Sequence, residues 1–274
     1  GSTATITNVN NVFTITPSTT QADAGSFSVT FSASDGSQAA TSVSDFTLSF
    51  GWLDISNASY DSLSFSVASQ ESSPRGMCFN SDGTKMFVLG WTSDAIYQYS
   101  LTNGFSLASG NVTYDNISFD VSTQSGNPVD LEFNTDGTKM FVLGQSNDAI
   151  YQYSLTTGFN ISSASYDNIS FSVLSQDTSA QGISFNSDGT KMFYTGSSQD
   201  KVHQYSLTNG FSLASGNVTY DNISFDVSTQ DATPIGLEFS PDGTKMFIVG
   251  YGNDRIYQYS LTNGFSLASG NVTY

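Results

Sequence analysis

The sequence has 274 residues, of which 38% are apolar and 14% aromatic, enough for a sizeable packed core, while only 11% are charged. Seven basic residues stand against 24 acidic ones, and the resulting net charge of −17 repels nucleic-acid phosphates and anionic membrane surfaces, so we expect neither as a partner. Abundant Ser, Thr, Asn and Gly disfavour a helical protein, and the absence of any run of about 18 apolar residues predicts no membrane span.

The first 52 residues differ from the rest of the chain and are predicted to form a short β-sandwich-like segment. Alternating apolar and polar residues predict strands at 11–16, 26–31 and 42–50, with a turn at 33–36. This pattern resembles the closing strands of cadherin-like or immunoglobulin-like modules of large surface proteins. Such modules need about 90 to 100 residues, so we expect the upstream strands to lie outside this sequence.

Residues 53–274 form a tandem repeat. The string Asp-Gly-Thr-Lys-Met-Phe occurs four times, and its copies are 54, 52 and 54 residues apart. Its positions are 82–87, 136–141, 188–193 and 242–247. A period of this length indicates a solenoid, a propeller or an array.

Each repeat is predicted to hold four strands. In the second repeat they fall at 128–133, 139–144, 149–155 and 168–174, rich in β-branched and aromatic residues and separated by turn residues. The Asp-Gly dipeptides lie where a tight hairpin needs a positive φ, and no stretch has helical periodicity. The sequence therefore predicts an all-β protein, a β-propeller of four-stranded blades with four repeats in this chain.

The last repeat stops before its fourth strand. Residues 260–274 are identical to 100–114, yet no copy of the following strand comes after them. Residues 63–67 are a spare copy of that strand, placed before the first full repeat. The missing strand is expected from 63–67, from sequence outside this chain, or from another copy.

The string at 239–250, followed by Asn-Asp-Arg-Ile-Tyr-Gln-Tyr at 253–259, resembles the repeats of lactonase-like and TolB-like β-propellers. The resemblance covers roughly residues 57–274. It implies the propeller fold and says little about function, because propellers host many chemistries.

Two sets of matched positions vary between repeats and are candidates for ligand binding. The position after the second strand holds Trp91 and Tyr251 in the first and last repeats, and Arg75 precedes the first strand. An exposed Trp and Tyr together with Arg75 and Arg255 suit a glycan or a protein surface. The alternative is drift in solvent loops.

A third variable position lies within the first strand and holds Cys78, Glu132, Ser184 and Glu238. In a closed ring of four units, Glu132 and Glu238 lie opposite each other, and paired carboxylates serve glycoside hydrolysis. The alternative is a set of solvated channel glutamates. We predict no catalytic residue, no metal ligand and no cofactor. The only hint of calcium is the start of the second Asp-Gly turn, and a hairpin explains that turn better.

These features favour a non-catalytic structural or recognition module of a fibre or adhesin type, located outside the cell, on the cell surface or on a phage virion. The location comes from the resemblance to surface modules. One alternative is a propeller enzyme of the lactonase or glycosidase type. Another is a filament subunit that self-assembles by strand exchange, because unpaired edge strands favour a homo-oligomer.

Overall fold

The structure, a computed structural model, describes residues 4–9, 12–17, 25–33, 41–50 and 55–274. The chain divides into two compact units, Gly1–Ala58 and Ser59–Tyr274. Among the described residues, no helix is long and apolar enough to cross a membrane.

Two antiparallel strand pairs make up the described part of the first unit. Strand β1 (Ala4–Val9) pairs with β2 (Val12–Pro17), and β3 (Gly25–Ala33) pairs with β4 (Thr41–Phe50). Strands β2, β3 and β4 match the three expected strands. Most of the predicted turn at 33–36 lies outside the described residues, and the cadherin-like or immunoglobulin-like module stays a prediction.

The second unit is a four-bladed β-propeller, which confirms the predicted fold. Each blade is a four-stranded antiparallel sheet whose strands follow one another in sequence. We number the blades 1 to 4 in chain order. Their strands are β5 (Pro74–Phe79), β6 (Lys85–Gly90), β7 (Ala95–Leu101) and β8 (Val112–Asp120); β9 (Pro128–Phe133), β10 (Lys139–Gly144), β11 (Ala149–Leu155) and β12 (Ala164–Ser172); β13 (Ala180–Phe185), β14 (Lys191–Gly196), β15 (Lys201–Leu207) and β16 (Val218–Asp226); and β17 (Pro234–Phe239), β18 (Lys245–Gly250), β19 (Arg255–Leu261) and β20 (Val272–Thr273).

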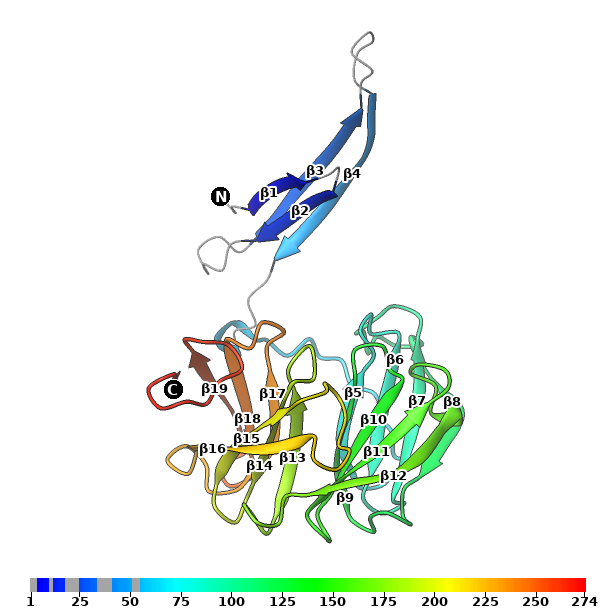
Figure 1. Ribbon diagram of the computed structural model, residues 1–274. Coiled ribbons are helices and arrows are strands. Elements are labelled where there is room, and N and C mark those ends of the chain that lie inside the picture. Colours follow the sequence, from blue (N-terminus) through cyan, green and yellow to red (C-terminus); the bar gives the residue numbers. More distant parts are fainter. Residues whose placement is uncertain (1–3, 10–11, 18–24, 34–40, 51–54) are drawn as a thin grey trace. The chain divides into compact units, whose positions relative to one another are not determined.

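The first strands of the blades lie at the middle of the propeller, and the fourth strands lie outside (Figure 1). Strand β5 packs against β9, β9 against β13, and β13 against β17. Side chains on these inner strands therefore come together from different blades, although about 53 residues separate them in sequence.

The core lies between the blades. Met140, Phe141, Val142 and Leu143 of β10 are fully buried, because blade 2 has a neighbouring blade on each side. Phe87 of blade 1 packs at a ring-centroid distance of 4.6 Å from Phe133 of blade 2. The same pair recurs as Phe141 with Phe185 and as Phe193 with Phe239.

The fourth strand of each complete blade begins earlier than the sequence predicts. In blade 2 it starts at Ala164 instead of residue 168. It carries Asn168 at a φ of 58°, and its register on β11 shifts between Gln152 and Tyr153. A bulge of this kind interrupts the alternation of side chains, so the pattern reveals only the part of the strand beyond it.

Blade 4 is completed differently from the others. Strand β20 pairs only Val272 and Thr273 with β19, whereas β12 forms seven such pairs with β11. Residues 63–67 belong to no strand of the structure. The structure therefore does not use these residues to complete the sheet of blade 4.

The Asp-Gly turns join the first and second strands. In blade 2, Asn134 accepts a hydrogen bond from the backbone N–H of Lys139, and Asp136 accepts bonds from the backbone and hydroxyl of Thr138. Gly137 has a φ of 71°, and a Cβ atom there would lie 2.3 Å from Cδ2 of Phe159. The turn thus needs glycine for its backbone conformation and for the ring packed on it.

Three glycine-to-alanine variants are expected to separate these two requirements. Gly137→Ala should be the most destabilising, by about 2–4 kcal/mol, because it adds a clash with Phe159 to the left-handed strain. Gly110→Ala should cost about 1 kcal/mol, since Gly110 has a φ of 77° but open space around its Cβ position. Gly126→Ala is the control, because Gly126 has open space and no positive φ. Urea unfolding measures all three, and equal losses for Gly137 and Gly126 would contradict this account.

Candidate functional site

The structure brings two of the four predicted ligand residues together on blade 1. The guanidinium carbon of Arg75 lies 4.6 Å from the centroid of the Trp91 ring, a cation–π contact. Arg75 is exposed, but Trp91 is half-buried and packs against the core between blades, so it is less accessible than we expected. The equivalent residues of blade 3, Gln181 and Ser197, also touch, by a hydrogen bond of 3.1 Å.

The other two predicted residues lie on blade 4. Tyr251 is 67% exposed, and Arg255 is also exposed at the start of β19. Arg255 lines a groove of about 380 Å³ together with Asn253 and Tyr274. A single ligand site that uses all four residues stays a prediction.

The variable position of the first strand holds a cluster of ionisable groups at the middle of the propeller. Cys78, Glu132, Ser184 and Glu238 occupy the same register, each opposite the phenylalanine of its neighbouring second strand. Ser184 is buried, Cys78 and Glu132 are half-buried, and Glu238 is exposed.

Glu132 and Glu238 act on each other electrostatically. Burial raises the pKa of Glu132 well above its ordinary value, and the negative charges of Glu238 and Asp130 raise it further. The surrounding inner strands also raise the pKa of Glu238 by desolvation. Because the side chain of Glu238 is solvent-exposed, its desolvation is partial, and Glu132 is the carboxyl that more readily keeps a proton.

Asp130 adds a third carboxyl that the sequence analysis missed. The matched positions in the other repeats are Gly76, Gly182 and Gly236, so Asp130 is the single side chain at this level of the inner strands. Its carboxylate accepts hydrogen bonds of 3.0 Å from the N–H of Leu131 and 2.9 Å from that of Ile183 in the next blade. Aspartate in place of a repeated glycine was the signal that could have revealed it.

Burial raises the pKa of Asp130 to about 7, and the charge of Glu238 also raises it, although the two backbone N–H bonds act in the opposite direction. Cys78 lies in the same electrostatic field. Burial and the charges of Glu132, Asp130 and Glu238 raise the pKa of its thiol, so it stays protonated and is a poor nucleophile.

His203, which stands where the other repeats carry Tyr97, Tyr151 and Tyr257, has a packing role. Its ring stacks on Tyr194 with centroids 4.9 Å apart, and Nδ1 lies 3.4 Å from the hydroxyl of Tyr220. Burial lowers its pKa to about 4, so the imidazole is neutral at physiological pH.

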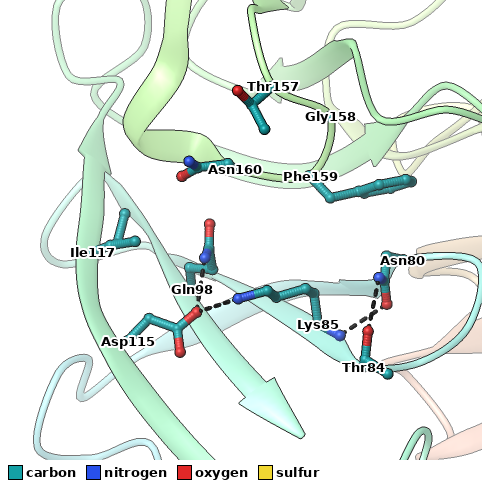
Figure 2. Close-up of a pocket in the computed structure, with 10 residues that line it drawn as sticks. All are labelled: Asn80, Thr84, Lys85, Gln98, Asp115, Ile117, Thr157, Gly158, Phe159 and Asn160. Atoms are coloured by element: carbon teal, nitrogen blue, oxygen red, sulfur yellow. Dashed lines mark hydrogen bonds and ion pairs between the residues drawn. The ribbon is translucent and has the colours of Figure 1, made fainter.

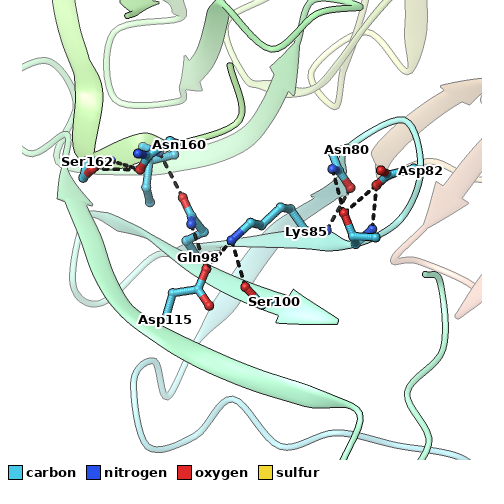
Figure 3. Close-up of polar contacts among 10 residues, drawn as sticks. Asn80, Asp82, Lys85, Gln98, Ser100, Asp115, Asn160 and Ser162 are labelled. Atoms are coloured by element: carbon cyan, nitrogen blue, oxygen red, sulfur yellow. Dashed lines mark hydrogen bonds and ion pairs between the residues drawn. The ribbon is translucent and has the colours of Figure 1, made fainter. Parts of the chain in front are cut away.

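A groove of about 550 Å³ between blades 1 and 2 has a different character (Figure 2). Asp115 accepts bonds of 2.8 Å from Nζ of Lys85 and 2.7 Å from Nε2 of Gln98 (Figure 3). Oε1 of Gln98 accepts the backbone N–H of Ile161 in the next blade, at 3.0 Å.

This polar network recurs in the next two blades. There the lysine–aspartate pairs are Lys139 with Asp167 and Lys191 with Asp221. The glutamines of those blades accept the N–H groups of Leu213 and Leu267. A network present in every complete blade joins each blade to the next and is structural, so the groove beside it is not a specialised site.

The acidic turn that hinted at calcium is occupied by its own hydrogen bonds, since Asp136 caps Thr138 as described above. Within residues 55–274, no three His, Cys, Asp or Glu side chains come together as metal ligands. Calcium binding itself stays untested.

Comparison with solved structures supports the lactonase-like resemblance at the level of the fold. A protein from Bacteroides fragilis that is described as a 6-phosphogluconolactonase matches with a TM-score of 0.48 at 17% identity. The match covers 73% of this chain and 52% of that one. An assigned 6-phosphogluconolactonase from Bacteroides uniformis matches with a TM-score of 0.47 at 12% identity, over 69% and 50%. The periplasmic gluconolactonase of Pseudomonas aeruginosa matches with a TM-score of 0.45 at 13% identity, over 73% and 52%.

The chain thus spans about half the length of these structures, and at such identities the likeness concerns the fold alone. No protein-family model matches the sequence, and no curated protein matches it significantly. The resemblance to TolB-like propellers stays a prediction.

Two expectations need correction. The prediction of a non-catalytic structural or recognition module, and with it the prediction that the chain is no enzyme, is contradicted by these comparisons, in which lactonases recur. Glu132 is not a simply solvated channel glutamate, because it is half-buried and the charges of Glu238 and Asp130 act on it. Asp130, Glu132 and Glu238 place three carboxyls with raised pKa values at the middle of the propeller, and this observation does not depend on the comparisons.

Asp130 should make the protein less stable at pH 8 than at pH 5. Its pKa is raised from 3.8 to about 7, so between these values the folded state holds a proton that the unfolded state has lost. The free energy of unfolding therefore falls as pH rises through this window and is largest below it. Asp130→Asn should remove part of this slope, by about 1 kcal/mol or more between pH 5 and pH 8.

Urea unfolding at both pH values measures this effect. Asp136→Asn is the matched control, because hydrogen bonds from Thr138 lower the pKa of Asp136 and the variant should not flatten the slope in this window. Identical slopes for the wild type and Asp130→Asn would show that Asp130 is ionised at ordinary pH.

Proposed function

We propose that this chain belongs to a propeller-type hydrolase in which Glu132 and Glu238 form an acid–base pair. The observation that carries the proposal is the mutual electrostatic effect of these two carboxyls at the middle of the propeller, where each pKa is raised. Carboxyls with raised pKa values that share a confined site are a recurrent arrangement for proton transfer near neutral pH.

The two environments assign the roles. Glu132 is half-buried, and the charges of Glu238 and Asp130 raise its pKa further, so it keeps its proton and serves as the general acid. Glu238 faces solvent, ionises more easily and serves as the general base that deprotonates a water molecule. Asp130 favours this division, because its charge raises the pKa of Glu132.

We propose a sugar lactone as the substrate class. The hydroxide formed as Glu238 takes the proton adds to the lactone carbonyl, the ring C–O bond breaks, and Glu132 gives its proton to the departing alkoxide. Water is consumed, a hydroxy acid is formed, and the acid and base have exchanged their proton states. The descriptions of the matched structures suggest a lactone, while the same pair of carboxyls would also serve a glycoside.

The proposal also includes a binding partner and a location. A small carbohydrate is the partner that it requires, and a surface rich in hydroxyl and amide groups supports a place outside the cytoplasm. Self-association through edge strands is a separate proposal that rests on other observations.

Hydrolysis of glucono-δ-lactone, followed by proton release above the spontaneous rate, tests the function. Glu132→Gln and Glu238→Gln should each lower kcat/KM about a hundredfold or more. The wild type should show a bell-shaped pH dependence, and each variant should lose one limb of it. Asp120→Asn is the control, because it removes an exposed carboxylate at the end of β8, outside the cluster.

Activity on aryl glycosides but not on lactones would overturn the substrate class and keep the acid–base pair. Folded wild type that hydrolyses neither, or variants as active as the wild type, would overturn the function.

A further inference from the structure

Within residues 55–274, the two end faces of the propeller carry exposed apolar side chains. On blade 4, Ile256 is 55% exposed, whereas the matched Ile96 and Ile150 are fully buried by the following blade. On blade 1, Met77 is 58% exposed, whereas the matched Leu131 is buried by the preceding blade. Within residues 55–274, no blade packs on the far side of blade 4 or on the near side of blade 1.

The segment before blade 1 has the sequence of a fourth strand. Residues 58–67 differ from 164–173 only by Ser62 for Asn168 and Leu63 for Ile169. Ser62 has a φ of 59°, matching the 58° of Asn168 within β12. The segment therefore has the sequence of an outer strand and a left-handed residue at the position of that strand's bulge, although it forms no strand in the structure.

This segment also packs on blade 1 as an outer strand packs on the next blade. The rings of Phe65 and Tyr99 meet edge to face at 5.7 Å, as those of Phe119 and Tyr153 do at 5.5 Å. Leu63, which matches the half-buried Ile169 of β12, is 43% exposed. The segment thus contacts blade 1 through Phe65, while its backbone pairs with no strand within residues 55–274.

The charges at the two ends are complementary. In blades 1 to 3, the lysine of the second strand pairs with an aspartate of the fourth strand. The matched lysine of blade 4 is Lys245, whose Nζ donates to the hydroxyl of Ser260 and has no ion pair among residues 55–274. The matched aspartate of the segment is Asp61, which is exposed and has no ion pair in this part of the chain either.

We propose that blade 4 of one molecule docks on blade 1 of a second copy of this chain. Residues 61–67 of the second copy then lie beside β19 of the first and complete its sheet, with Asp61 paired to Lys245. The contact is head to tail, so the same contact made twice closes a ring of two copies, and other geometries give longer chains.

A second copy is the occupant that the observations favour. Each of the three interfaces within the chain joins these same two faces, with the same edge-to-face contact between a phenylalanine of the fourth strand and a tyrosine of the next blade. The lysine–aspartate pairs join the second and fourth strands inside each blade, so a fourth strand supplied by a second copy would also supply the aspartate. Residues 55–274 carry one unused example of each face. The inference does not depend on the hydrolase, because none of Glu132, Glu238 and Asp130 takes part in it.

Charge exchange on the 274-residue chain tests the docking. Lys245→Asp and Asp61→Lys should each weaken self-association of the pure protein about tenfold, as measured by sedimentation velocity. An equimolar mixture of the two variants should recover the association, because each mixed pair can form contacts with opposite charges. The double variant should also associate like the wild type, since every contact then carries the reversed pair.

Lys139→Asp is the control, since Lys139 pairs with Asp167 inside blade 2 and its loss should change stability without changing association. Leu174→Glu is a second control, because Leu174 is 52% exposed and lies on neither end face. A monomeric wild type at micromolar concentration would overturn the proposal. So would association that the charge changes leave intact, or single variants that mixing does not rescue.

Discussion

Every blade of this protein depends on its neighbours, because the second strand of each sheet is apolar on both faces. Met, Phe, Val and Leu stand side by side in β10 and are fully buried. Such a strand cannot be satisfied within one sheet, and burial of each large apolar side chain is worth about 1.5–3 kcal/mol. A single repeat would leave this surface in water, so the blades must stack, and stacking produces the propeller.

The same constraint explains both the middle and the ends of the molecule. Stacking directs the first strand of each blade inward, so equivalent positions of different repeats meet. The side chains at these inward-facing positions can differ between repeats, because they face the middle of the propeller and do not pack in the interfaces between blades. At the two ends, no further blade packs on these faces within residues 55–274, and Ile256 and Met77 are exposed where their counterparts are buried.

Polar contacts reinforce the stacking in a repeated manner. A glutamine of the third strand receives a backbone N–H from the next repeat, and its amide group donates to the aspartate that also holds a lysine. Repetition separates structure from function here. Contacts found in every complete blade hold the fold together, whereas Asp130, Glu132 and Glu238 break the repeat and form the candidate site.

The sequence by itself determined the period, the strands of each repeat and the Asp-Gly hairpins, because these depend on local patterns and turn chemistry. It also singled out Glu132 and Glu238, since a repeat supplies its own internal comparison. Only the tertiary structure decided that Asp130 lies with these two glutamates and that Trp91 is partly covered. It also decided that residues 63–67 form no strand pairing within residues 55–274. These outcomes depend on which strands of different repeats lie side by side, and stacking between blades fixes that, because no local pattern within one repeat encodes its neighbour.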